Sequence, residues 1–367
     1  MVHSDLCRSM SVLHTFVKIK TVYRKFYFAT MKKKIILGIL LVVCLVGGYA
    51  AWQVFGPTVS QPESKYFYIK TGAVYSDVRQ SLVDQKIIGN TFFFDIVSKQ
   101  LKYPGKVKPG RYQIKKGTSI FSLIRMLRSG NQSAVQLVIN KLRLKEDLAK
   151  KIAANFECDS AAVMKVLTDP EILRRYHVDN NTMMTTVIPN TYSIFWNTPA
   201  EKIIDKLHSE KKKFWNAGRL NKAKALNLTP EQVYTMASIV EEETNKEHDK
   251  GLIASVYMNR ISSGMKLQAD PTVKFAMKNF GLKRILYKHL SFDSPFNTYQ
   301  NAGLPPGPIC TPSTKTIDAV LNAPQTNYIY FVAKPDWSGL SNFTHSDEEH
   351  MINAKNYQHF LDSVNIK

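Results

Sequence analysis

Three adjacent carboxylates, Glu241 to Glu243, end a predicted helix whose remaining residues are mostly apolar. The helix is predicted to begin at Thr229, because threonine is a good N-cap, Pro230 suits the first helical position and Gln232 completes a capping box. Apolar residues then recur at helical spacing and define one buried stripe, made of Val233, Met236, Ala237, Ile239 and Val240.

The three carboxylates point in different directions from this helix. At about 100° per residue, Glu243 lies roughly 50° from the centre of the apolar stripe, Glu241 roughly 110° and Glu242 roughly 150°. Glu242 is therefore expected to face water, and Glu243 is not. Burial raises the pKa of a carboxyl group, which suits a general acid working near neutral pH. The alternative is a solvated acidic run at a helix end, and these residues alone leave both interpretations open.

The composition is that of a folded protein with a strongly basic charge balance. The chain has 367 residues, 44% of them hydrophobic, and a net charge of +21. Such a charge favours nucleic acid, an anionic membrane surface or an acidic polymer as a partner. The sequence has no helix-turn-helix, zinc-finger, RNP or arginine-rich signature, so nucleic acid is not expected. No metal cluster or nucleotide loop is visible either, and we expect no cofactor.

The four cysteines lie at positions 7, 44, 158 and 310, without metal-ligand spacing. Cys44 is in an apolar run and Cys7 in a basic tail, which leaves Cys158 and Cys310 as the one pair that could form a bridge. We expect these two thiols to be free.

Residues 35–55 contain no charged side chain and are long enough to cross a hydrocarbon core of about 30 Å. Tyr49 and Trp52 near the far end suit an interfacial belt, and the preceding tail, residues 1–34, is basic. The positive-inside rule predicts a single-pass inner (cytoplasmic) membrane protein with a cytoplasmic N-terminus and an exported remainder. A retained anchor is preferred over a cleaved signal peptide, because no small-residue cleavage site follows. The run MKKKIILGILL resembles a natural start at Met31.

Beyond a predicted polar linker, residues 56–65, strand-like and helix-like runs alternate, which predicts an α+β fold. Residues 108–132 predict a short strand, a turn at Gly117, a helix capped by Ser119 and a stop at Gly130. This pattern resembles the LysM-like subdomain of some cell-wall enzymes; a generic α+β module is the alternative. We predict a small LysM-like subdomain over 66–140 and a larger mixed catalytic domain over 141–367, with a cleft between them.

Two loops could line a saccharide cleft, and a further segment is a predicted turn. Residues 265–273, MKLQADPTV, form a predicted turn that starts a helix. Residues 296–313, FNTYQNAGLPPGPICTPS, are too rich in glycine and proline for regular structure. Residues 187–196, VIPNTYSIFW, read as a proline- and aromatic-rich loop. Amide, hydroxyl and aromatic groups suit a sugar wall, although well-packed connectors have the same composition.

Four separated motifs in this order resemble the YceG-like, or MltG, family of membrane-anchored endolytic murein transglycosylases. They are ASIVEEET from Ala237, MKLQADPTV from Met265, NTYQNAGLPPGPICTPS from Asn297 and YIYFVA from Tyr328. The chain departs from the family at two positions. Asn190 stands where the PDTY loop usually has an aspartate, and Glu242 stands where a lysine is common.

The resemblance implies one catalytic glutamate, Glu243, immediately before Thr244. In such enzymes the acid protonates the glycosidic oxygen between N-acetylmuramic acid and N-acetylglucosamine, the muramyl C6 hydroxyl closes on C1, and a 1,6-anhydromuramyl end results. Peptidoglycan strands would then be the substrate and peptidoglycan synthases candidate partners. The predicted sugar contacts are Thr244, Gln268, Asn297 and Tyr299.

Two other functions stay open at this stage. A tethered, non-catalytic peptidoglycan-binding scaffold would use Glu243 only structurally. A hydrolytic muramidase would need a second carboxylate, for which Glu241, Asp270 and Asp293 are the candidates.

Overall fold

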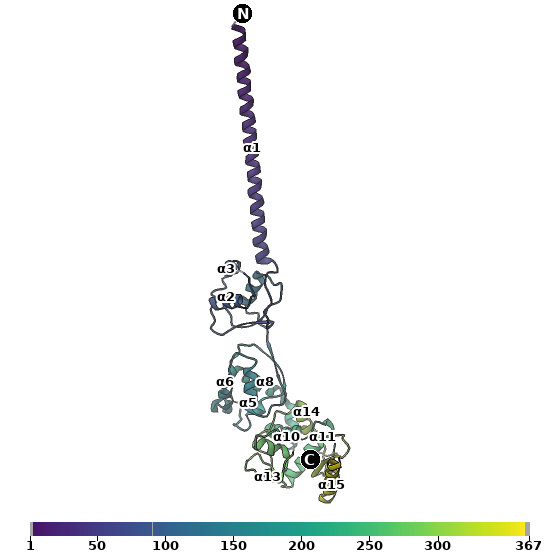
Figure 1. Cartoon of the computed structure of the whole chain (residues 1–367). Helices are drawn as coiled ribbons and strands as arrows, with labels where there is room; N and C mark the ends of the chain where they lie inside the picture. The colour runs from purple at the N-terminus through teal and green to yellow at the C-terminus, as the bar shows by residue number, and fades with distance from the viewer. Residues whose placement is uncertain (1–2, 90, 283, 364–367) are drawn as a thin grey trace. The chain divides into compact units, whose positions relative to one another are not determined.

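The computed structural model describes residues 3–89, 91–282 and 284–363. The chain divides into two compact units, residues 1–133 and 134–367 (Figure 1). Helices alternate with short antiparallel strands, and the described residues form three two-stranded sheets. The α+β class predicted from the sequence is therefore confirmed.

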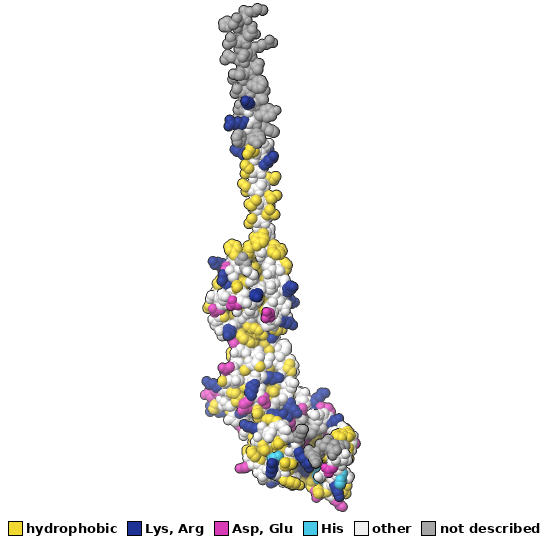
Figure 2. All heavy atoms as spheres, in the orientation of Figure 1, with side chains coloured by type: hydrophobic (Ala, Val, Ile, Leu, Met, Phe, Trp, Pro, Cys, Tyr) yellow, Lys and Arg dark blue, Asp and Glu magenta, His cyan; other side chains and the backbone are white. Residues whose placement is uncertain are grey.

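The chain begins with a long helix, α1 (His3–Phe55). Its part from Thr30 to Phe55 has 26 residues and a mean hydropathy of 2.4, and its apolar stretch is not buried in the protein. Apolar side chains cover this part of the helix in Figure 2. The length and composition suit a membrane span, as the sequence predicts, and they also suit a signal sequence.

The rest of the first unit packs three helices against a small antiparallel sheet. Strand β1 (Tyr66–Ile69) pairs with β2 (Gly110–Gln113), and the helices are α2 (Tyr75–Asp84), α3 (Thr91–Gln100) and α4 (Ile120–Ser129). Fully buried side chains from all of these elements form one core, among them Phe67, Leu82, Phe94, Tyr112, Leu123 and Leu127.

The strand, turn and helix predicted for residues 108–132 are present. Gly117 has φ 80°, the Ser119 hydroxyl accepts a hydrogen bond from the Ser122 amide at 3.1 Å, and Gly130 ends α4 with φ 74°. The likeness of this unit to a LysM module stays a prediction.

The segment predicted as a linker, residues 56–65, is packed onto the first unit. Val59 is buried in its core, and the Val59 amide donates to the Thr118 carbonyl at 3.0 Å. The Ser60 amide donates to the Ile87 carbonyl at 2.9 Å. Proline and serine in this stretch predict a polar linker, but Val59 and Pro62 are buried, so the chain leaves α1 without a free tether.

The second unit begins with strand β3 (Val135–Ile139), which pairs with β4 (Asn190–Ile194). The predicted subdomain boundary at residue 140 therefore falls after a strand that belongs to the second unit. The prediction of an irregular loop over residues 187–196 is wrong at its centre, where residues 190–194 form β4. Tyr192 and Ile194 on this strand face the core.

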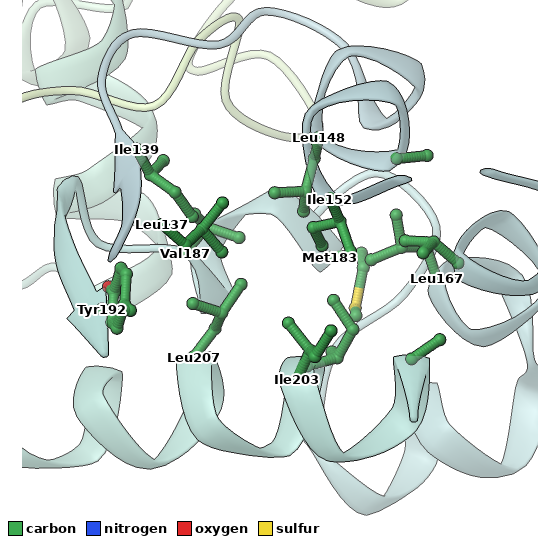
Figure 3. Close-up of a cluster of buried hydrophobic side chains, with 14 of the residues drawn as sticks. Leu137, Ile139, Leu148, Ile152, Leu167, Met183, Val187, Tyr192, Ile203 and Leu207 are labelled. Carbon is green, nitrogen blue, oxygen red and sulfur yellow. The ribbon is translucent and has the colours of Figure 1, made fainter. Parts of the chain in front are cut away.

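A first hydrophobic cluster holds this sheet against helices α5 (Lys145–Ala153) and α8 (Ala200–Phe214). Figure 3 shows Leu137 and Ile139 of β3, Leu148 and Ile152 of α5, and Ile203 and Leu207 of α8 in this cluster. The shorter helices around it are α6 (Ser160–Thr168), α7 (Pro170–Arg175) and the 3₁₀ turn η1 (Met183–Thr186).

A second cluster surrounds α10 (Pro230–Glu243), the helix that carries the three carboxylates. All residues from 233 to 240 are buried, including Tyr234, Thr235 and Ser238 outside the predicted apolar stripe. Its main neighbours are α11 (Glu247–Ser262) and α14 (Thr314–Leu321). The remaining elements are α9 (Ala217–Ala225), α12 (Asp270–Ala276), α13 (Tyr287–Leu290), β5 (Tyr330–Ala333), β6 (Ser341–Thr344) and α15 (Asp347–Ser363). Because α10 is enclosed on all sides, each carboxylate at its end must find its own partner.

Candidate active site

The start and the end of α10 are both fixed by specific contacts. The Thr229 hydroxyl accepts from the Gln232 amide at 3.2 Å, and the Gln232 side chain accepts from the Thr229 amide at 2.8 Å, so the predicted capping box is confirmed. After Glu243 the backbone becomes extended at Thr244, with φ −146°. The last helical residue is therefore presented at a defined helix end.

Glu242 is not solvent-facing, and that prediction is wrong. Its side chain is 13% exposed and forms a bidentate ion pair with Arg143, at 3.1 and 2.8 Å, and a further ion pair with Lys141 at 3.4 Å. The Arg143 hydrogen bonds and the Lys141 charge hold the pKa of Glu242 below its usual value, against the effect of burial. The helical wheel missed this because the basic segment after β3 lies over the face that it assigned to solvent.

Replacing Arg143 with methionine is expected to lower stability by about 1–3 kcal/mol, since it leaves a mostly buried carboxylate with one weaker partner. The measurement is the Tm of the full chain at pH 7. The Arg143→Lys variant keeps the charge but loses the bidentate contact, so its Tm should lie between those of the wild type and the methionine variant. Equal Tm values for all three proteins would contradict the role assigned to this ion pair.

Glu241 turns in a third direction, toward the start of α14. Its Oε2 accepts from the Ser313 hydroxyl at 3.1 Å and from the Thr316 hydroxyl, and the Lys250 ammonium lies 3.6 Å away. These contacts give Glu241 a structural role in joining α10, α11 and α14.

Glu243, the last of the three carboxylates, is held by a tyrosine hydroxyl. Its side chain is half-buried, and its Oε1 accepts a hydrogen bond of 2.7 Å from the hydroxyl of the buried Tyr257 on α11. Burial raises the pKa of Glu243 to about 7, the Tyr257 hydrogen bond acts in the opposite direction, and the negative charge of Asp270 raises it further. A large fraction of Glu243 is thus protonated at neutral pH, as a general acid requires.

Two other predicted site residues lie in the electrostatic neighbourhood of Glu243. The Tyr299 hydroxyl donates to the Asp270 Oδ1 at 2.6 Å, which ties the loop of residues 296–313 to the start of α12. Burial and this hydrogen bond raise the pKa of Tyr299, so its hydroxyl stays protonated. Of the three muramidase candidates, Asp270 is the one whose charge is among the causes that raise the pKa of Glu243.

Gln268 and Thr244 are partly accessible to a ligand. Gln268 is exposed, has a left-handed φ of 53° and accepts from an Arg260 Nη1 at 3.2 Å. The Thr244 hydroxyl accepts from the Lys246 amide at 3.0 Å. The remaining carboxylate candidate, Asp293, is exposed, and Asn190 at the start of β4 is exposed as well.

Asn297 has a different position from the one predicted. It is fully buried, and its Nδ2 donates to the carbonyls of Leu290 and Phe292 at 3.0 and 2.8 Å. Its Oδ1 accepts from the Tyr299 amide at 3.0 Å. The side chain is buried and hydrogen-bonded within its own loop, so it is not accessible to a sugar and instead positions the Tyr299 backbone.

Asn297→Asp should lower the stability of the second unit by about 2–4 kcal/mol, because a carboxylate would face two carbonyl oxygens without water. The measurement is the thermal transition of the full chain. The same substitution at Asn301, whose side chain is exposed and also donates to backbone carbonyls, should cost less than about 1 kcal/mol. An equal loss at both positions would contradict the structural role of Asn297.

Arg260 is a site residue that the sequence analysis did not identify. It is buried near the end of α11 and donates to the carbonyls of Ile329 and Leu267, at 2.6 and 2.9 Å, and to Gln268. One guanidinium thus joins α11, the segment before α12 and the approach to β5. An arginine four residues before the Gly264 break was the available signal.

A small cavity of about 60 Å³ lies beside Glu242. Its lining includes Arg143, Lys274, Phe275 and Phe280. Over the described ranges, no three His, Cys, Asp or Glu side chains are arranged to hold a metal ion. Cys158 and Cys310 are both free thiols.

These features are those of a general-acid site. One half-buried carboxyl group has a raised pKa and accepts a hydrogen bond from a tyrosine hydroxyl, and polar loops lie on either side of it in the sequence. Comparison with known proteins gives the family. The YceG-like family model matches residues 67–356, and the chain therefore belongs to the YceG-like family.

Two relatives carry a functional name. The endolytic murein transglycosylase of Bacillus subtilis is 30% identical over 287 residues, which cover 73% of this chain and 77% of that protein. The protein of the same name from Streptococcus pneumoniae serotype 2 is 25% identical over 351 residues, which cover 86% of this chain and 63% of the relative. The chain thus spans less than two thirds of the pneumococcal protein.

The fold also has a solved relative. A crystal structure of a YceG-like protein from Listeria monocytogenes matches with a TM-score of 0.55 and 28% sequence identity. The match covers 79% of this chain and 99% of that one.

Proposed function

We propose that this protein is an endolytic murein transglycosylase, a lyase that cuts peptidoglycan strands, with Glu243 as its catalytic acid. The observation that carries the proposal is the half-buried Glu243, hydrogen-bonded by Tyr257 and with its pKa raised to about 7. The names of the Bacillus and Streptococcus relatives supply the substrate class.

In the proposed reaction, protonated Glu243 donates its proton to the glycosidic oxygen between N-acetylmuramic acid and N-acetylglucosamine, and the C1–O bond breaks. The ionised Glu243 then takes the proton of the muramyl C6 hydroxyl as that oxygen bonds to C1. The products are a 1,6-anhydromuramyl end and a free N-acetylglucosamine hydroxyl. Glu243 is regenerated, and no water is consumed, so a second catalytic carboxylate is not required.

Three polar side chains are proposed as sugar contacts around this acid: Thr244, Gln268 and Tyr299. Hydroxyl and amide groups suit the hydroxyl and acetamido groups of the sugars, and donors near the ring stabilise the charge of the transition state. Asn297 acts behind them through the position of Tyr299.

Helix α1 is proposed to hold the enzyme in the cytoplasmic membrane as a single span. The basic residues before it keep the N-terminus in the cytoplasm, so the part of the first unit after α1 and the whole second unit lie outside, where peptidoglycan is assembled. From this position the enzyme would terminate or trim nascent strands beside peptidoglycan synthases.

The test is mass spectrometry of purified peptidoglycan incubated with the full-length protein in detergent. Anhydromuramyl ends within the strands are the expected product. Reducing ends would favour a muramidase, for which Asp270 is the candidate second carboxylate because its charge acts on Glu243. Intact glycan with retained binding would overturn the enzymatic proposal in favour of a tethered scaffold.

A further inference from the structure

Helix α3 has an apolar face that the core of the first unit does not use. Phe94 and Val97 on its inner side are buried, whereas Phe92 is 61% and Ile96 45% exposed. Phe92 and Ile96 are four residues apart, so they lie on one side of the helix. The acidic residue of this helix, Asp95, pairs with Arg79 at 3.0 Å and accepts from the Tyr75 hydroxyl. Exposed apolar side chains therefore dominate this face without an unpaired negative charge beside them.

This face lies next to the end of α1. The rings of Tyr49 and Phe93 meet edge to face with centroids 6.1 Å apart, and those of Phe55 and Phe121 are 5.4 Å apart. Helix α1 thus packs directly on α3 and α4 (Figure 1). Trp52 and Phe55 are also more than half exposed, and Figure 2 shows apolar side chains gathered where the helix meets the unit. The exposed residues of α3 continue an apolar surface that begins on α1.

The length of α1 sets the level of this surface in a membrane. Thr30 to Phe55 spans 26 residues, or about 39 Å at 1.5 Å per residue, against about 30 Å of hydrocarbon. The three lysines at 32–34 must stay in the headgroup layer on the cytoplasmic side. About twenty helical residues cross the hydrocarbon core, so the outer boundary of the hydrocarbon falls near Phe55. Tyr49 lies about 9 Å before Phe55 along the axis. Tyr49 is therefore on the hydrocarbon side of this boundary, and Phe93, whose ring centroid is 6.1 Å from that of Tyr49, lies within reach of the outer lipid layer.

We propose that Phe92 and Ile96 insert into the outer boundary of the lipid bilayer and dock the first unit on the membrane that α1 crosses. Phenylalanine and isoleucine gain free energy when they leave water for this region. Lys99, exposed one turn later, has the length and charge to reach lipid phosphates. This inference rests on the membrane anchor of the proposed function, but not on the reaction.

Docking would fix the distance of the first unit from the bilayer and its tilt relative to the membrane plane. The segment from 56 to 65 is packed and not a free tether, and a second contact through α3 would remove rotation about the end of α1. The competing occupant is a second copy of this chain, which would bury the same side chains in protein and not in lipid.

The test uses the full-length protein in vesicles of phosphatidylethanolamine and phosphatidylglycerol. The four cysteines are replaced by alanine, one nitroxide label is placed through Phe92→Cys, and collisions with oxygen and with a water-soluble nickel chelate are measured. Leu40→Cys, in the middle of the apolar helix, is the lipid reference. Ser129→Cys, exposed at the end of α4 away from α1, is the water reference.

We expect the ratio of oxygen to nickel accessibility at position 92 to exceed that at position 129 several-fold and to approach that at position 40. Water-like accessibility at 92 with lipid-like accessibility at 40 would overturn docking and leave the anchor intact. Water-like accessibility at both would overturn the anchor and docking together. Low accessibility to both reagents at 92 would overturn lipid insertion in favour of a protein contact. Product analysis of the glycan is independent of all these outcomes.

Discussion

Glu243→Gln is expected to lower the rate of glycan cleavage by about 10³-fold or more. General acid catalysis usually accelerates a reaction by about 10²- to 10⁴-fold, and this variant would lose that contribution. Glutamine keeps the shape of the side chain and can still accept the Tyr257 hydrogen bond, but it cannot donate a proton to the glycosidic oxygen. The measurement is the rate at which anhydromuramyl ends form in purified peptidoglycan, followed by mass spectrometry. Activity within tenfold of the wild type would contradict the assignment of the acid.

The matched control is Glu247→Gln, four residues later, at a side chain that is 57% exposed and outside the proposed chemistry. It should leave the rate unchanged within a factor of about two. Folding of the Glu243 variant can be checked independently, because the pKa of the wild-type carboxyl rises from its ordinary 4.5 to about 7 on folding. Stability is therefore lost as pH rises from about 4.5 to 7, by an amount on the order of 1–3 kcal/mol. Glu243→Gln removes this loss and should melt higher than the wild type at pH 8.

The half-buried position of Glu243 could be predicted from the sequence because it depends on local geometry. The cap at Thr229 fixes the start of α10, and fourteen helical residues later Glu243 falls beside the apolar stripe. The same reasoning failed for Glu242, because a wheel describes one helix and the partner comes from elsewhere. Arg143 is 99 residues distant, and the segment that carries it follows a strand whose pairing the sequence did not reveal.

Asn297 shows a second limit of sequence reasoning. An asparagine in a rigid loop suits both a ligand contact and an internal brace, and only the positions of the Leu290 and Phe292 carbonyls decide between them. The packing of residues 56–65 onto the first unit was not predicted for a related reason. Its two buried residues, Val59 and Pro62, stand among exposed polar ones, and a pattern this short cannot be told from a solvated connector.

The rate of cleavage should fall about tenfold for each pH unit above pH 7. The reactive form carries the proton on Glu243, and the fraction in that form decreases as pH rises through the pKa of about 7. The measurement is the initial rate of the full-length enzyme under substrate-limited conditions from pH 5 to 9. A rate that continues to rise up to pH 9 would mean that the ionised carboxyl is the required form, and would reverse the role assigned to Glu243.

Tyr257→Phe tests the cause of that pH dependence. The Tyr257 hydroxyl stabilises the ionised form of Glu243, so its removal raises the pKa and moves the falling limb toward higher pH. Tyr287→Phe, at a side chain that is 93% exposed, loses the same hydroxyl outside the site and should keep the wild-type profile. A limb that moves to lower pH in Tyr257→Phe would show that the hydroxyl favours the protonated acid. A lower rate with an unmoved limb would reduce Tyr257 to a packing residue, because a group that only fills space changes the rate without changing the proton equilibrium of its neighbour.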